Sequence, residues 1–164
     1  MYWGVEYRRE FSYSFAGDMT VPDEMLLGMQ MHHNGGQSNP YGMVNTNAGW
    51  QFWIRNMSNY NASGHTIQKY QILGPNQPPS VATKYDFVFE VKHGTVASGA
   101  YLRLWCNGNL VCNITNFVIG FPSEPAEVND AGQLKLETNY DFRNQQNGVT
   151  SVFLGPTDKL MSIT

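Results

Sequence analysis

A glutamine and two histidines, Gln30, His32 and His33, interrupt an otherwise apolar segment, MLLGMQMHH at residues 25–33. In an extended strand successive side chains point to opposite faces, so Gln30 and His32 share one face and His33 lies on the other. A glutamine amide donates hydrogen bonds to oxygen atoms, and a histidine can take up a proton near neutral pH. The pair suits a site that holds an acidic group and moves a proton. Two polar residues on a solvated sheet face would give the same pattern.

Other groups of titratable residues fit catalysis less well. Asp86 and Glu90 share a strand face, but their separation of roughly 13 Å far exceeds the about 5 to 5.5 Å of a retaining glycosidase pair. His32 and His33 point apart in an unbroken strand and cannot chelate one metal ion. We therefore expect no transition-metal site and no required cofactor. The loop EPAEVND at residues 124–130 could bind structural calcium through the hard oxygen atoms of Glu124, Glu127, Asn129 and Asp130. It could also be merely a solvated acidic loop.

The composition is that of one globular domain, which we expect to span residues 1–164. Of the 164 residues 41% are apolar and 13% aromatic, enough for one hydrophobic core. Charged residues make up 14% and the net charge is −3, which argues against a nucleic-acid partner. No apolar run approaches the about 20 residues of a membrane helix, and the first ten residues lack the apolar centre of a signal peptide. We expect a soluble protein without a membrane partner.

Alternation of apolar and polar residues recurs along the chain and predicts about ten short strands. Clusters of Gly, Pro, Asn and Ser separate them, and only residues 125–132 could form a helical turn. Short strands with turns about every 8 to 12 residues favour an all-β fold, an antiparallel β-sandwich or jelly roll. The expected strands are residues 7–15, 25–33, 41–47, 50–56, 66–73, 85–93, 100–106, 110–117, 133–142 and 150–154.

Several of these strands carry one apolar face and one face of amides, charges and aromatic rings. Such a face suits sugars, because a pyranose offers an apolar side to an aromatic ring and a rim of hydroxyls to polar groups. Trp53 and Trp105 could stack on sugar rings, although packing is the commoner role of tryptophan in a sandwich. Arg55 and Arg103 lie two residues away on the same strands. Further cations that could attract an anionic glycan are Arg9, Lys92 and Lys135.

Two cysteines, Cys106 and Cys112, flank the segment CNGNLVC, whose Asn-Gly pair is a strong hairpin signal. A two-residue turn there places Cys106 opposite Asn109 and Cys112 opposite Arg103. The two thiols would then point to opposite faces of the sheet, so we expect no disulfide between them.

The order of several segments resembles that in the heparin-lyase-I-like and alginate-lyase-like polysaccharide lyases. The resemblance covers about residues 7 to 155 and is most specific in the middle of the chain. It implies a concanavalin-A-like jelly roll, secretion from the cell, and β-elimination on an anionic polysaccharide that contains uronic acid. The segments that carry it are EYRREFSYSF at 6–15, LLGMQMHH at 26–33, KYDFVFEVK at 84–92, SGAYLRLW at 98–105 with the hairpin after it, and GQLKLETNY at 132–140.

The Gln-x-His motif of these lyases matches Gln30 and His32. The resemblance implies that Gln30 holds the uronate carboxylate, which makes the proton on the neighbouring carbon acidic, and that His32 lies near that proton. The Arg-Ser/Thr-Glu-Leu motif has only a distant counterpart in Arg8, Arg9, Glu10 and Phe11.

A second lyase motif, Tyr-Phe-Lys-x-Gly-x-Tyr, is similar to QLKLETN at residues 133–139. Lys135 matches the motif lysine, whereas Glu137 stands at the glycine position and Asn139 at the final tyrosine position. Tyr140 follows one residue later and would reach the catalytic face through a bulge. The predicted catalytic residues are therefore Gln30, His32 and Tyr140. The predicted substrate-binding residues are Arg9, Trp53, Arg55, Arg103, Lys135 and Asn139.

The sequence leaves two alternatives to a lyase. The shifted tyrosine and the short chain are also compatible with a sugar-binding module that has no catalytic activity. A structural jelly roll with no glycan ligand is the third reading, and a test for the unsaturated product of β-elimination separates the first reading from the other two.

Overall fold

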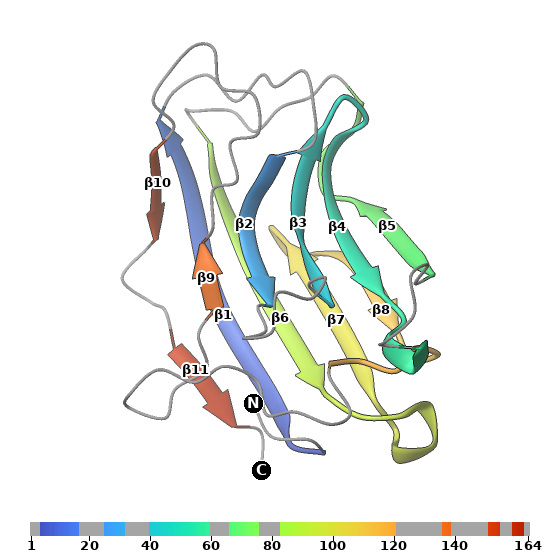
Figure 1. Cartoon of the computed structure of the whole chain (residues 1–164). Helices are drawn as coiled ribbons and strands as arrows, with labels where there is room; N and C mark the ends of the chain where they lie inside the picture. The colour runs from blue at the N-terminus through green and yellow to red at the C-terminus, as the bar shows by residue number, and fades with distance from the viewer. Residues whose placement is uncertain are drawn as a thin grey trace.

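Two antiparallel β-sheets lie face to face in the computed structural model (Figure 1). The structure describes residues 4–16, 25–31, 40–59, 66–75, 83–120, 136–138, 151–154 and 159–162. A six-stranded sheet has the order β10-β1-β6-β7-β8, and β11 also pairs with β1. Its strands are β1 (Glu6–Ala16), β6 (Lys84–Lys92), β7 (Tyr101–Cys106), β8 (Asn109–Ile114), β10 (Ser151–Leu154) and β11 (Lys159–Ser162).

The second sheet has five strands in the order β5-β4-β3-β2-β9. Its strands are β2 (Met25–Met31), β3 (Tyr41–Thr46), β4 (Gly49–Arg55), β5 (Ile67–Gln71) and β9 (Leu136–Thr138). Two short 3-10 helices occur in the described residues, η1 (Met57–Asn59) and η2 (Val96–Ser98). No described helix is long and apolar enough to cross a lipid bilayer.

The all-β antiparallel sandwich that the sequence predicts is confirmed. Each of the ten expected segments overlaps one observed strand, from β1 to β10. The eleventh strand, Lys159–Ser162, was not predicted, because its sequence KLMS places two apolar residues next to each other and does not alternate. It pairs with residues 7–10 of β1, beyond the part of β1 that pairs with β10. Residues 125–132, which could form a helical turn, lie outside the described residues.

The hydrophobic core fills the space between the sheets and is rich in aromatic rings. In β6 the alternation is regular, and Tyr85, Phe87, Phe89 and Val91 are buried as the sequence predicts. From the other sheet Trp50 reaches the same layer, with its ring centroid 5.5 Å from that of Phe87. The buried positions mark the inward face of each sheet. The residues that alternate with them along each strand form the two outer faces of the sandwich.

A β-bulge corrects the prediction for the two cysteines. The hairpin forms at Asn107-Gly108, both with positive φ, and Cys106 pairs with Asn109 as expected. The register then shifts, so that Cys112 lies opposite Leu104 rather than Arg103. Both thiols therefore point into the core, and the prediction of opposite faces is wrong. The two cysteines are free, which agrees with the expected absence of a disulfide between them.

A buried histidine and tyrosine meet at one end of the core. His93 follows β6, and its Nε2 lies 3.1 Å from the hydroxyl oxygen of Tyr41 in β3. Burial lowers the pKa of His93 to about 3, and burial also raises the pKa of Tyr41 far above its usual value. Both shifts favour neutral groups, so the hydrogen bond joins an uncharged phenol and an uncharged imidazole. The pair links the two sheets by a hydrogen bond without burying a charge.

Acid should destabilise the fold through His93. The unfolded chain takes up a proton near pH 6.5, whereas the folded chain resists protonation down to about pH 3, so stability is lost as the pH falls through this interval. The slope is up to about 1.4 kcal/mol per pH unit. We expect urea denaturation to show a smaller loss for His93→Gln than for the natural chain between pH 6.5 and about 4.5. An identical loss in the two proteins would contradict this assignment.

Candidate functional site

The two segments that resemble lyase motifs, 100 residues apart in the sequence, are neighbours in the five-stranded sheet. Strand β2 pairs with β9, and Gln30 lies opposite Glu137. On the other side of β2, Gln30 lies opposite Gly42 of β3. Met29 and Met31, on either side of Gln30 in the chain, are both buried in the core. Alternation along β2 therefore assigns position 30 to the outer face of the sheet.

A row of paired positions crosses the whole outer face at this level. Gly42 pairs with Trp53 of β4, and Trp53 pairs with Lys69 of β5. The row therefore runs from Glu137 through Gln30, Gly42 and Trp53 to Lys69, one position from each strand. Gly42 contributes no side chain, so the row has a gap between Gln30 and Trp53. We call these five positions the central row.

The indole ring of Trp53 is covered by the ammonium group of Lys69. The ammonium nitrogen of Lys69 lies 3.8 Å from the centroid of the indole, and the indole N–H donates to Oε1 of Gln51 at 2.9 Å. Only 7% of Trp53 is exposed, whereas Lys69 is exposed. This is a cation–π contact. The expected stacking of a sugar directly on Trp53 is thus not supported, and Lys69 is the accessible group above it.

Sequence reasoning did not select Lys69 as a site residue. In TIQKYQ, residues 66–71, the alternation is weak and no motif marks the lysine. The register places it at Trp53, and this register depends on pairing between strands that the alternation of one strand does not reveal.

The three predicted substrate-binding arginines point in three different directions. Arg55 shares the outer face of β4 with Trp53, two residues further along, and is half-buried. Arg9 alternates with Arg8 in β1 and belongs to the same inward set as the buried Phe11, whose ring centroid lies 5.8 Å from its guanidinium carbon. Arg103 is in β7 of the six-stranded sheet, between the buried Leu102 and Leu104, and faces away from the core.

The three arginines of the predicted substrate-binding set therefore do not share one face. Of the three, the structure keeps Arg55 with the central row. Arg9 points between the sheets because odd positions of β1 do, and Arg103 lies on the outer face of the opposite sheet together with Trp105. The alternation of one strand sorts residues onto faces, but it does not tell to which sheet the strand belongs.

Several predicted site residues fall outside the part of the chain that the structure describes. They are His32, Lys135, Asn139 and Tyr140, and the proposed calcium ligands Glu124, Glu127, Asn129 and Asp130. Within the described ranges, no three residues among His, Cys, Asp and Glu are grouped so that they could hold a metal ion.

The fold is similar to that of two solved lyases. An endo-β-1,4-glucuronan lyase from the fungus Trichoderma reesei has a TM-score of 0.53 and 14% identity, over 74% of this chain and 53% of that chain. A mutant of the alginate lyase Aly36B, in complex with an alginate trisaccharide, has a TM-score of 0.52 and 16% identity, over 98% of this chain and 72% of that chain.

This chain thus spans about half the length of the glucuronan lyase. No protein-family model matches the sequence, and a search of curated proteins finds no match. The likeness is one of fold, and it agrees with the resemblance that the sequence segments carry. The chain has the β-sandwich fold found in polysaccharide lyases.

Proposed function

We propose that this chain cleaves an anionic polysaccharide that contains uronic acid, by β-elimination at the outer face of the five-stranded sheet. The observation that carries the proposal is the pairing of Gln30 with Glu137, which makes β2 and β9 neighbours in one sheet. The similarity of fold to a glucuronan lyase and an alginate lyase supports the same activity.

The reaction requires a hydrogen-bond donor to the uronate carboxylate, a base that takes the C5 proton and an acid that protonates the leaving oxygen. The proton on C5 of a uronate becomes acidic when hydrogen-bond donors neutralise the neighbouring carboxylate, and the amide of Gln30 is suited to this role. His32 or Tyr140 accepts the C5 proton. The electron pair forms the C4–C5 double bond as the C4–O bond breaks, and a proton is returned to the leaving oxygen. Arg55 and Lys69 supply positive charge on the same face.

The activity is tested with a panel of glycans. We expect incubation with glucuronan or alginate to produce the ultraviolet absorbance of an unsaturated uronate, and incubation with a neutral glucan to produce none. Binding to glucuronan or alginate without a rise in absorbance would select the sugar-binding module instead. Neither binding nor absorbance with any uronate glycan, including heparin, would contradict the proposal.

Lys69 should attract the anionic substrate without taking part in the chemistry. The Lys69→Met variant removes the charge and keeps an unbranched side chain over Trp53. We expect KM on glucuronan or alginate to rise on the order of fivefold with kcat unchanged, as for the loss of about 1 kcal/mol of exposed charge interaction. The effect should shrink in high salt, which screens exposed charges.

Lys84 provides the matched control for this experiment. It is an exposed lysine on the six-stranded sheet and forms an ion pair with Asp86 at 2.7 Å. Lys84→Met should leave KM unchanged. Equal effects of the two substitutions would mean that net charge, and not the position of Lys69, determines the affinity.

A further inference from the structure

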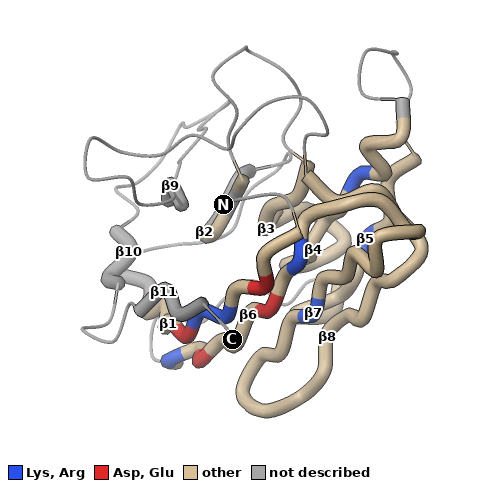
Figure 2. The backbone as a smooth tube through the Cα atoms, turned by 90° about the horizontal axis from the view of Figure 1, so that it is seen from below, with Lys and Arg blue, Asp and Glu red and all other residues tan. Residues whose placement is uncertain are grey.

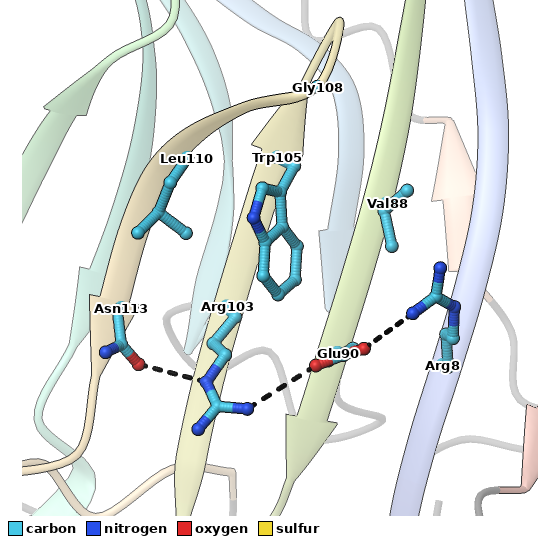
Figure 3. Close-up of a pocket in the computed structure, with 8 residues that line it drawn as sticks. All are labelled: Arg8, Val88, Glu90, Arg103, Trp105, Gly108, Leu110 and Asn113. Carbon is cyan, nitrogen blue, oxygen red and sulfur yellow. Dashed lines mark hydrogen bonds and ion pairs between the residues drawn. The ribbon is translucent and has the colours of Figure 1, made fainter.

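An open groove of about 490 Å³ lies on the outer face of the six-stranded sheet, on the side of the sandwich away from the central row (Figure 3). Its apolar part consists of Val88 of β6, Trp105 of β7 and Leu110 of β8. Trp105 is half-buried, and Leu110 is 56% exposed, the most exposed large apolar residue among those described. We call this feature the outer groove. It presents an indole ring and an isobutyl group to solvent side by side.

A chain of polar groups forms one side of the outer groove. Nη1 of Arg8 donates to Oε1 of Glu90 at 2.8 Å, and Nη1 of Arg103 lies 3.6 Å from Oε2 of the same carboxylate. Nε of Arg103 donates to Oδ1 of Asn113 at 3.2 Å. Figure 3 shows these groups in a line below the indole of Trp105, from Asn113 on β8 to Arg8 on β1. Glu90 is held between two guanidinium groups, so its position is fixed before any ligand arrives.

These groups leave hydrogen-bonding capacity for a ligand. The hydrogen bond and the ion pair use the amide oxygen of Asn113 and Nε and Nη1 of Arg103, and the guanidinium carbon of Arg103 lies 4.6 Å from the ring centroid of Tyr101. The NH2 group of Asn113 and Nη2 of Arg103 therefore remain as donors. A carboxylate has about four acceptor sites, and the two guanidinium groups do not occupy all of them at Glu90. Fixed donors and an acceptor beside an aromatic ring match the hydroxyl rim and the apolar side of a pyranose.

The charges around the outer groove balance. Arg8 also pairs with Glu10 at 2.8 Å. Lys92 pairs with Glu6 at 3.8 Å. Figure 2 shows acidic and basic positions close together along β1 and β6. A surface with neighbouring opposite charges does not attract a polyanion as Lys69 of the central row and Arg55 on the same face would.

We propose that the outer groove is a second, non-catalytic saccharide-binding site that takes uncharged pyranose units, with Trp105 as the stacking platform. The two sites lie on opposite sheets, so one sugar unit cannot contact both. The outer groove would bind a neutral glycan next to the acidic polysaccharide on which the other face acts. The proposal does not depend on the lyase activity, because none of its residues belongs to the central row.

Calorimetric titration with cellohexaose, xylohexaose and mannohexaose tests the proposal. We expect the whole chain to bind at least one of these neutral hexasaccharides. Trp105→Ala should weaken that binding at least about tenfold, as expected for the loss of a central aromatic contact. Trp105→Phe, which retains a ring, should recover part of the affinity. Asn113→Ala replaces an exposed residue and should weaken binding severalfold without disturbing the core.

Val96→Ala is the control, because Val96 is 50% exposed and lies in η2, outside the outer groove. Its affinity should equal that of the natural chain. The proposal is overturned if no neutral hexasaccharide binds, or if Trp105→Ala and Asn113→Ala both bind as tightly as the natural chain. Binding of a glucuronan hexasaccharide that Trp105→Ala abolishes would also overturn it, since the outer groove would then take charged sugars. Lyase activity on soluble glucuronan or alginate should be the same in Trp105→Ala as in the natural chain.

Discussion

The Gln30→Ala variant is expected to lose on the order of 100-fold or more in kcat/KM on glucuronan or alginate while keeping its fold. Removing a hydrogen-bond donor that stabilises charge in the transition state costs about 10²- to 10³-fold in rate. Position 30 is on the outer face of β2, between the buried Met29 and Met31, so the core is not directly changed. We therefore expect a change in the free energy of unfolding within about 0.5 kcal/mol. Initial rates of absorbance increase, together with urea denaturation, measure both quantities.

A second glutamine on the same face provides the control. Gln71 is exposed on β5, and its amide nitrogen donates to the carbonyl oxygen of Leu73 at 3.2 Å. Gln71→Ala removes an amide of the same kind outside the central row and should leave kcat/KM unchanged. If Gln30→Ala unfolds the protein but retains full activity per folded molecule, Gln30 has a structural role and the catalytic assignment is wrong.

The Trp50→Ala variant is expected to lower the free energy of unfolding by about 3–5 kcal/mol, the usual cost of removing a large buried aromatic side chain. Trp50 has no exposed surface and packs edge-on against Tyr85 and Phe87 of the opposite sheet, with ring centroids 5.3 and 5.5 Å apart. The truncation therefore leaves a cavity in the layer that holds the two sheets together. Urea denaturation followed by far-ultraviolet circular dichroism measures the loss.

Trp105→Ala is the comparison for this measurement, because it removes the same side chain from a half-buried position on an outer face. Its cost should be less than half that of Trp50→Ala, since less apolar area is returned to water. Equal costs for the two substitutions would contradict the assignment of Trp50 to the central core.

The strands could be predicted from the sequence because period-2 alternation is a local property. In β6 the buried and outward residues are those that the alternation of Tyr85 to Lys92 predicts. Register is different, because one additional residue changes every later pairing. The bulge beside Trp105 turns Cys112 toward the core, and no residue type in CNGNLVC announces it.

The site could be predicted only in part, because alternation is local whereas the pairing of strands is not. Alternation assigns Gln30 and Trp53 to outward faces, and the structure places both in the central row. Alternation also assigns Arg103 and Trp105 to an outward face, but that face belongs to the other sheet. Membership of a sheet depends on long-range pairing between strands. Lys69 was missed because its importance comes from its partner Trp53 and not from its own segment.

The mass of the products released from glucuronan or alginate tests most directly whether the central row carries out β-elimination. Beta-elimination adds no water, so each new non-reducing end is lighter by one water molecule than the end that hydrolysis gives. We predict oligosaccharides with this unsaturated mass from the natural chain, and far less of them from Gln30→Ala in the same time. Products with the hydrated mass, or unsaturated products formed equally fast by Gln30→Ala, would contradict a lyase site at the central row.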